Sequence, residues 1–145
     1  MSARFAVVDT NVVVSGLLTR DAHSPTAQIL DGMLRGAFRF LLSGDLLAEY
    51  RTVLLRTKIR AIHGLSPEQI DRLLAAIAGN ATLREPESIS APNPYRGDEH
   101  VWRLAALYSD TTLVTGDRDL FDSAPRGTTV LSPRRFMALI NNPDT

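Results

Sequence analysis

Short runs of consecutive apolar residues alternate along this chain with longer segments whose apolar positions repeat at helical spacing. A short apolar run is typical of a strand buried on both faces, whereas the longer repeat is typical of a helix with one buried face. Alternation of the two predicts an α/β fold in which helices cover a parallel sheet. The predicted strands are residues 3–8, 38–42, 112–115 and 128–131.

Residues that commonly begin helices support the helical assignments. Ser43 precedes an apolar stripe at helical spacing, and Ser66-Pro67-Glu68-Gln69 places a capping serine before a proline at the first helical position. The segment 10–18 continues the first apolar run, with Asn11 as a helix cap and Gly16 as a bend. The predicted helices are residues 25–35, 45–57, 67–78, 98–108 and 133–140. The remaining predictions are a loop at 19–25, an extended connection at 82–97 and a loop with one helical turn at 116–126.

Composition indicates an ordinary globular protein. The 145 residues are 44% hydrophobic and 22% charged, which suits a single domain. No apolar run approaches the roughly 20 residues of a membrane-spanning helix, and the N-terminus is predicted to be a strand and not a signal peptide. The absence of cysteine excludes disulfides and thiolate metal ligands. These features favour the cytoplasm.

Charge adds one constraint. The formal net charge is zero, which argues against binding nucleic acid by overall positive charge. Lys58 is the single lysine among 16 basic residues. Arginine suits bidentate contacts to phosphate, although a general preference of the genome for arginine is the simpler explanation. Zero net charge still permits carboxylates in a pocket with arginines around it.

Acidic residues cluster at three places that the predicted fold can bring together. Asp9 follows the first predicted strand and Asp117 follows the third. Asp98 and Glu99 begin a predicted helix. Ligands of parallel sheets bind beyond the carboxyl ends of the strands, where Asp9 and Asp117 fall. Neighbouring carboxylates repel one another and raise each other's pKa unless a hard cation holds them. The pattern therefore predicts a metal site suited to phosphodiester hydrolysis.

Four stretches carry a more specific pattern: VVDTNVVVSGLL (7–18), LLSGDLLAEYRTVL (41–54), RGDEHVWRLAAL (96–107) and LVTGDRDLFD (113–122). With the closing segment 128–140, they resemble the PIN-domain family of metal-dependent ribonucleases over nearly the whole chain. The combination of the DTN start with the TGDRDLF end is specific, whereas either alone is weak. Within the family, the chain is most similar to the VapC-like toxins of bacterial toxin–antitoxin pairs.

This resemblance implies a three-layer α/β/α sandwich with a mostly parallel sheet of four or five strands, forming one domain over residues 1–145. It also implies Mg²⁺ or Mn²⁺ in an acidic pocket, cleavage of RNA, a cognate antitoxin protein as partner, and a homodimer. Carried over position by position, the catalytic and metal-binding residues would be Asp9, Glu49, Asp98 and Asp117, with Asp119 assisting.

Two of these assignments have alternatives. Asp98 shares a helical face with Val101 and Trp102, which predicts that it points inward, but the spacing to the TGD segment favours Glu99. Glu49 lies at the edge of an apolar helical stripe and could instead be a surface residue paired with Arg51 or Arg56.

Several further residues have supporting roles in this interpretation. Thr10 and Asn11 either orient the site by hydrogen bonds or simply cap a helix. Thr115 is a candidate for phosphate contact, Asp122 for a helix cap, and His100 for the surface. The loop arginines that could contact RNA are Arg20, Arg96, Arg118 and Arg126.

Three other functions compete with this one. Phosphotransferases with an aspartyl nucleophile need a second Asp two residues after the first, where this chain has Asn11. A non-catalytic interaction module would bind metal without cleaving RNA. A nuclease of RNA maturation would keep the chemistry and lack an antitoxin.

Overall fold

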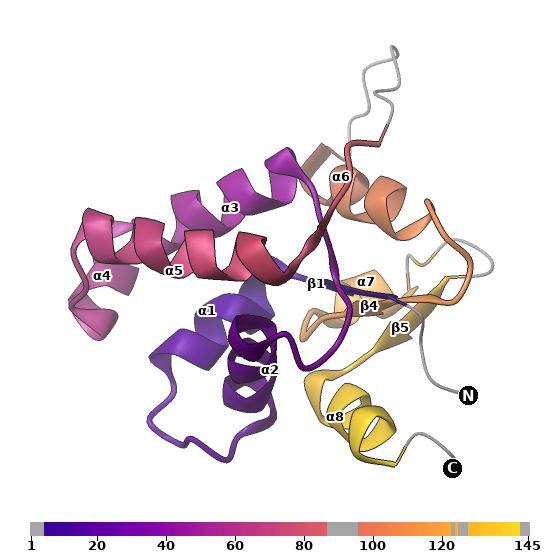
Figure 1. The fold of residues 1–145 in the computed structure, drawn as a ribbon, viewed down its shortest axis with the longest axis horizontal. Helices are drawn as coiled ribbons and strands as arrows, with labels where there is room; N and C mark the ends of the chain where they lie inside the picture. The colour runs from indigo at the N-terminus through magenta and orange to yellow at the C-terminus, as the bar shows by residue number, and fades with distance from the viewer. Residues whose placement is uncertain (1–4, 87–95, 123, 125–127, 143–145) are drawn as a thin grey trace.

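The computed structural model describes residues 5–86, 96–122, 124 and 128–142, with only the backbone of residues 96–98. Its main sheet has three parallel strands in the order β1-β4-β5. These strands are β1 (Phe5–Val8), β4 (Thr111–Val114) and β5 (Thr129–Leu131). Every residue of β1 and β4 is buried, as the unbroken apolar run of β1 predicts; β4 buries two threonines with its two apolar residues. Figure 1 shows β4 between its two neighbours.

A second, two-stranded sheet extends this arrangement. Strand β2 (Leu41–Leu42) pairs in parallel with β3 (Thr82–Leu83), and a single parallel bridge joins Ala6 of β1 to Phe40. Strand β3 lies in the segment that the sequence predicts to be a connection. It is held by backbone hydrogen bonds, such as the one that Thr82 N donates to Phe40 O at 2.8 Å, and such bonds leave no side-chain pattern.

Eight helices lie in the described part of the chain. The predicted serine caps are confirmed: Ser43, Ser66 and Ser132 each accept a hydrogen bond from the backbone N–H three residues on. The helices are α1 (Thr10–Leu18), α2 (Pro25–Arg35), α3 (Gly44–Leu54), α4 (Thr57–His63), α5 (Pro67–Asn80), α6 (Arg96–Ala105), α7 (Arg118–Asp122) and α8 (Pro133–Asn141).

Two helical predictions need correction. Helix α4 was not predicted, because it buries no residue and has no side-chain cap. Helix α6 begins at Arg96 and ends at Ala105, earlier at both ends than the predicted 98–108. After it the chain turns into β4 through Asp110, whose φ of 65° is left-handed.

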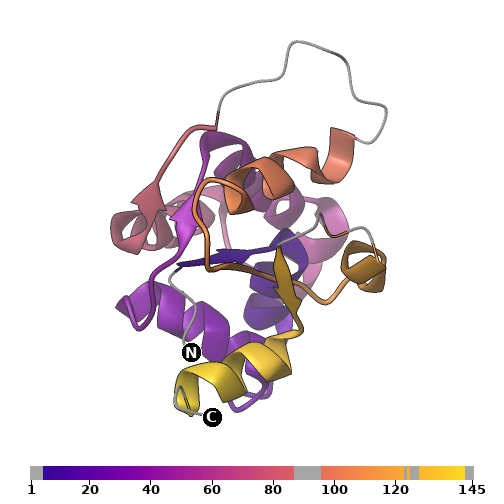
Figure 2. The ribbon, with the colours of Figure 1, turned by 90° about the vertical axis from the view of Figure 1, so that its right-hand side faces the viewer.

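The helices form layers on both sides of the sheet. Helix α6 packs on β1, β2 and β4, while α8 packs on β5 and on α2. Figure 2 shows α6 on one side of the sheet and α8 on the other. The predicted α/β fold with a parallel sheet between helices is therefore confirmed.

Helix α1 packs closely against α2 at Gly16. This glycine was predicted to mark a bend in the chain. Gly16 lies inside α1 without interrupting it. A Cβ atom at this position would lie 2.5 Å from the backbone oxygen of Thr26. The residue is glycine because the two helices approach each other here, and not because the chain turns.

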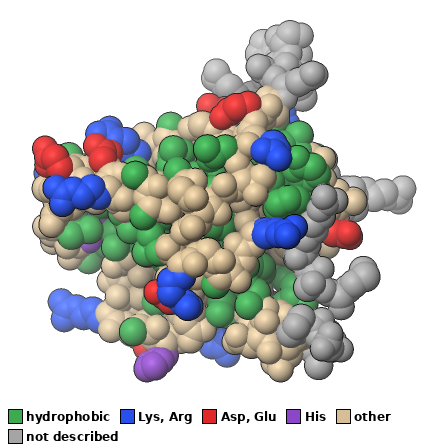
Figure 3. Space-filling model, viewed as in Figure 1, with side chains coloured by type: hydrophobic (Ala, Val, Ile, Leu, Met, Phe, Trp, Pro, Cys, Tyr) green, Lys and Arg blue, Asp and Glu red, His purple; other side chains and the backbone are tan. Residues whose placement is uncertain are grey.

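The surface drawn in Figure 3 carries charges of both signs side by side, most visibly over α4 and α5. Among them, Arg51 of α3 pairs with Asp71 of α5 at 2.8 Å. In the described residues, no helix is long and apolar enough to cross a membrane.

Candidate active site

The register of the sheet places Asp9 beside Thr115. Val8 of β1 lies opposite Val114 of β4, and Asp9 N donates to Val114 O at 2.9 Å. The segments that follow Val8 and Val114 then leave the sheet at the same edge. The hydroxyl of Thr115 donates to Asp9 Oδ2 at 2.7 Å. Both side chains are buried, Thr115 completely.

Asp9 also caps helix α1. Its Oδ1 accepts a hydrogen bond from Thr10 N at 2.9 Å, so the capping role expected of Asn11 belongs to Asp9. Asn11 instead donates from Nδ2 to Asp9 Oδ2 at 3.0 Å and accepts from Gly116 N at 3.2 Å. The predicted orienting role of Asn11 thus has a geometric basis, because one side chain ties the Asp9 carboxylate to the loop after β4.

Glu49 of α3 lies near Asp9 through Thr10. Glu49 Oε2 accepts a hydrogen bond from the Thr10 hydroxyl, and Glu49 Oε1 lies 3.3 Å from His100 Nε2. Of the two arginines considered as partners of Glu49, Arg51 binds Asp71 instead. Arg56 does interact with Glu49, because its charge helps to lower the pKa of that carboxyl.

The prediction that His100 lies on the surface is also wrong. Its side chain is 15% exposed and faces Glu49. The sequence contains one indication that His100 faces inward: it lies one helical turn before Leu104, which is completely buried.

The contact between Glu49 and His100 shifts the pKa values of both side chains. The hydrogen bond to His100 lowers the pKa of Glu49, with a further contribution from Thr10, and the hydrogen bond to Glu49 raises the pKa of His100. The expectation that carboxylate repulsion raises pKa values is therefore wrong for Glu49. His100 and the Thr10 hydroxyl stabilise its negative charge.

Tyr50 connects the elements that carry the two carboxylates. It follows Glu49 in α3, is completely buried, and donates its hydroxyl hydrogen to Val8 O at 2.5 Å. Burial, together with the nearby Asp9 and Glu49, raises the pKa of Tyr50 well above its usual value, so it remains a donor. The residue after Glu49 is thus bonded to the residue before Asp9.

Asp117 is held at the same edge of the sheet. Its N–H donates to Thr115 Oγ1 at 3.0 Å, and its Oδ1 accepts from Asp119 N at 3.0 Å. Asp117 therefore caps the start of α7. Asp122 is the exposed last residue of that helix, so the capping role predicted for it is wrong. Thr115 is too buried to reach phosphate; its hydroxyl binds the Asp9 carboxylate and the Asp117 backbone instead.

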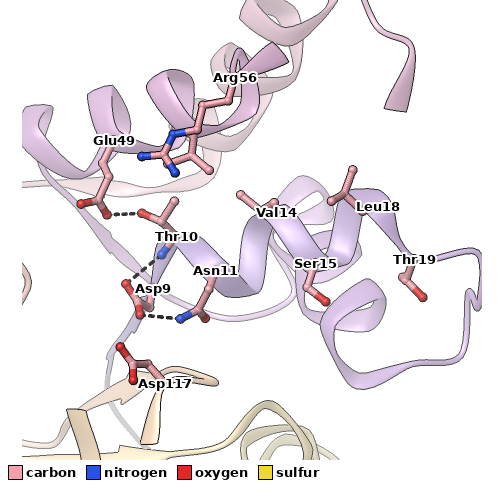
Figure 4. Close-up of a pocket in the computed structure, with 11 residues that line it drawn as sticks. Asp9, Thr10, Asn11, Val14, Ser15, Leu18, Thr19, Glu49, Arg56 and Asp117 are labelled. Carbon is pink, nitrogen blue, oxygen red and sulfur yellow. Dashed lines mark hydrogen bonds between the residues drawn. The ribbon is translucent and has the colours of Figure 1, made fainter. Parts of the chain in front are cut away.

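The carboxylates of Asp9, Glu49 and Asp117 line one open pocket of about 660 Å³. Figure 4 shows Asp9, Glu49 and Asp117 gathered at one end, while Leu18 and Thr19 lie at the other. The full lining is Asp9, Thr10, Asn11, Val14, Ser15, Leu18, Thr19, Glu49, Val53, Arg56 and Asp117.

Other predicted residues do not line this pocket. Glu99 is half-buried, while Asp119, Arg118 and Arg20 are exposed. The side chains of Asp98, Arg96 and Arg126 lie outside the described residues. The opposite end of the pocket was not predicted from the sequence; it is formed by Val14, Ser15 and Leu18 of α1, by Thr19 just after it and by Val53 of α3. Arg56 was predicted only as a possible surface partner of Glu49.

The donor atoms suit a hard divalent cation, because the acidic residues of the pocket offer only oxygen. Within the described residues, no group of three or more His, Asp or Glu side chains is arranged closely enough to hold a metal. Mg²⁺ does not require such a cage, since it keeps several waters and is commonly bound through one or two carboxylates together with substrate phosphate.

Comparison with known families gives one match. The family model described as PIN domain matches residues 6–119, well over half of the chain, and this span includes all three carboxylates of the pocket. PIN domains are generally metal-dependent nucleases that act on RNA. A comparison with curated proteins finds no significant match.

Proposed function

Because the chain belongs to the PIN-domain family, we propose that it is a metal-dependent endoribonuclease that hydrolyses RNA phosphodiester bonds in this pocket. One observation carries the proposal: Asp9, Glu49 and Asp117 come from distant parts of the sequence and line the same open cavity. Three carboxylates around one cavity repel one another, so their convergence favours a role in binding a cation.

Asp9, Glu49 and Asp117 would hold one or two Mg²⁺ or Mn²⁺ ions. Asp98 is proposed as a further ligand on sequence grounds, with Glu99 as its alternative, and Asp119 as an assisting residue. When bound, the metal supplies a water of lowered pKa and offsets charge on the phosphate oxygens.

The protein's own contribution is to fix the carboxylates before substrate arrives. Hydrogen bonds from Thr10 N, Asn11 and Thr115 orient Asp9. Thr10 and His100 orient Glu49 and keep it ionised. Partners of this kind commonly affect metal affinity or activity by about 10–100-fold.

The cellular role that we propose is the toxin of a type II toxin–antitoxin pair, with a cognate antitoxin as partner and a homodimeric protein. This rests on the resemblance of the DTN and TGDRDLF motifs to VapC-like toxins. A small reading frame adjoining the gene supports this role, whereas its absence favours an RNA-processing nuclease.

The test is cleavage of a mixed RNA pool by purified protein with Mn²⁺ or Mg²⁺, compared with EDTA. Asp9→Asn and Asp117→Asn should each abolish cleavage while leaving the circular dichroism spectrum unchanged. Asp31→Asn is the matched control, because Asp31 is exposed on α2 and pairs only with Arg35 among the bonds described. Cleavage that survives both site variants would show that this pocket is not the active site. Metal binding without cleavage would favour an interaction module.

A further inference from the structure

Helix α4 is attached to the rest of the protein by few interactions. It buries no residue, and no side chain caps its first turn. Ile59 packs against the edge of the core, and the helix lies against α1 and α3. Figure 1 shows α4 beside the far ends of α3 and α5, away from the main sheet. A helix this short is unstable alone, so the contacts at its ends decide whether it stays folded.

His63, the last residue of α4, forms two hydrogen bonds with backbone atoms. Its Nε2 lies 2.8 Å from Leu54 O at the end of α3, and its Nδ1 lies 2.9 Å from Leu65 N. A carbonyl oxygen can only accept a hydrogen bond, and an amide N–H can only donate one. Nε2 therefore carries the hydrogen of the ring, and Nδ1 accepts from Leu65 N. The ring ties α4 both to the preceding helix and to the turn before α5.

This arrangement requires a neutral imidazole. A protonated histidine carries a hydrogen on each ring nitrogen. The hydrogen on Nδ1 would point at the N–H of Leu65, so the hydrogen bond would become a repulsive contact. Gly64, which lies between the two residues, has a left-handed φ of 69° that turns the chain back toward the ring. Protonation of His63 therefore opposes this closed turn.

Charged residues around α4 also oppose protonation of His63. Helix α1 contains no ionisable side chain, and those of α3 are Asp45, Glu49, Tyr50 and Arg51. Of these, Arg51 lies closest in sequence to the end of α3 and is paired with Asp71 of α5. The other charged residues of α4 and its N-cap are all basic: Arg56, Lys58 and Arg60. Arg60 lies three residues before His63 on the same helix, where like charges repel.

We propose that His63 is a pH-sensitive latch, which holds α4 closed when neutral and releases the helix when it gains a proton. Release also reaches the carboxylate pocket, because Arg56 is the N-cap residue of α4 and lines that pocket. In Figure 4, Arg56 lies on the side of the pocket that holds Thr10 and Glu49. Acid would thus free a positively charged residue from the pocket. The latch does not depend on the proposed nuclease function.

The first test compares hydrogen exchange in the unchanged protein and in His63→Gln, by mass spectrometry of peptides that cover residues 55–66. Glutamine can donate to Leu54 O and accept from Leu65 N, and it takes up no proton in this pH range. At about pH 7.5 the two proteins should exchange within about twofold of each other. At about pH 5.5, one unit below the usual imidazole value, the unchanged protein should exchange about tenfold faster.

Two controls separate release of α4 from general unfolding. Peptides of α2 should exchange equally in both proteins at each pH. His23→Gln should keep the full response of α4 to acid, because His23 is exposed and the bonds described for it involve only its backbone. Equal exchange of α4 in the unchanged protein and His63→Gln at about pH 5.5 would overturn the latch. Acceleration that extends equally to α2 would overturn it too.

The second test observes the ring itself and does not rely on glutamine replacing histidine. The chain has three histidines, so a variant that combines His23→Gln with His100→Gln retains only His63. With ¹⁵N-labelled histidine, ring NMR signals at about pH 7.5 should show hydrogen on Nε2 alone. Both nitrogens should carry hydrogen at the pH where α4 begins to exchange quickly. Hydrogen on Nδ1 at neutral pH would overturn the latch, as would a protonated ring in a protein whose α4 still exchanges slowly.

Discussion

The hydroxyl of Thr115 donates to Asp9 Oδ2 at 2.7 Å and accepts from Asp117 N at 3.0 Å. Asp9 and Thr115 are 106 residues apart, and the parallel register of β1 and β4 brings them together. One buried hydroxyl therefore binds the carboxylate of Asp9 and the backbone of Asp117. This relationship makes Thr115 a positioning residue, because its side chain has no exposure through which to touch substrate.

Replacing Thr115 with valine keeps the shape and removes the hydroxyl. We expect Thr115→Val to reduce kcat/KM about 10–100-fold and to destabilise the protein by about 1–3 kcal/mol, because Asp9 loses a buried partner. Steady-state cleavage and urea unfolding measure the two effects. Thr111→Val is the control: it removes a hydroxyl that donates to Tyr108 O at 2.8 Å, at the opposite end of the same strand. A similar loss of activity in both variants would indicate a general effect of stability.

The pair of Glu49 and His100 should make the stability of the metal-free protein depend on pH. Glu49 has a lowered pKa, so its contribution is present above its unfolded value near 4.5 and is lost as pH falls through the folded value. His100 has a raised pKa, so its contribution is present below about 6.5 and is lost as pH rises through the folded value. Both contributions are complete between these two values.

The variant His100→Gln isolates this effect, because glutamine stays neutral at every pH. In EDTA, it should be less stable than the unchanged protein by roughly 1 kcal/mol between about pH 4.5 and 6.5. The difference should shrink in more acidic and in more alkaline solution. Thermal unfolding over a pH series measures it, and a difference that does not vary with pH would rule out the ionic pair.

Metal should stabilise a protein that is already folded without it. Asp9 is held by Thr10, Asn11 and Thr115, so we expect EDTA to leave the fold intact. Mg²⁺ at about 100 times its Kd should then add about 2.7 kcal/mol. Calorimetry with and without Mg²⁺ tests this, and Asp9→Asn should abolish the increase while Asp31→Asn keeps it. An equal increase in all three proteins would place the bound metal elsewhere.

Two glycines within helices should respond oppositely to alanine. Gly16→Ala should destabilise the protein by about 1–3 kcal/mol, because its Cβ would lie 2.5 Å from the backbone oxygen of Thr26. Gly79→Ala in α5 should stabilise it by about 0.5–1 kcal/mol, since nothing lies within 4 Å of the added atom. Urea unfolding of both variants gives the two signs. A stabilising Gly16→Ala would mean that α1 and α2 pack less closely than described.

The sequence predicts those parts of the fold that depend on local physics. An unbroken apolar run marks β1, and a shorter one flanked by threonines marks β4, because both faces of these strands are buried. Serine caps mark the starts of α3, α5 and α8 because a side-chain oxygen bonds a nearby N–H. Strand β3 and helix α4 were missed because backbone pairing and exposed side chains leave no periodic pattern.

Sequence also identifies which carboxylates to examine, since Asp9 and Asp117 follow strands whose carboxyl ends share one edge. Only the tertiary structure decides what surrounds them. Strand register places Thr115 against Asp9. The packing of the helices turns His100 toward Glu49 and places Arg56 at the pocket. These contacts join residues distant in sequence, and their energies depend on distance and burial, which no local pattern encodes.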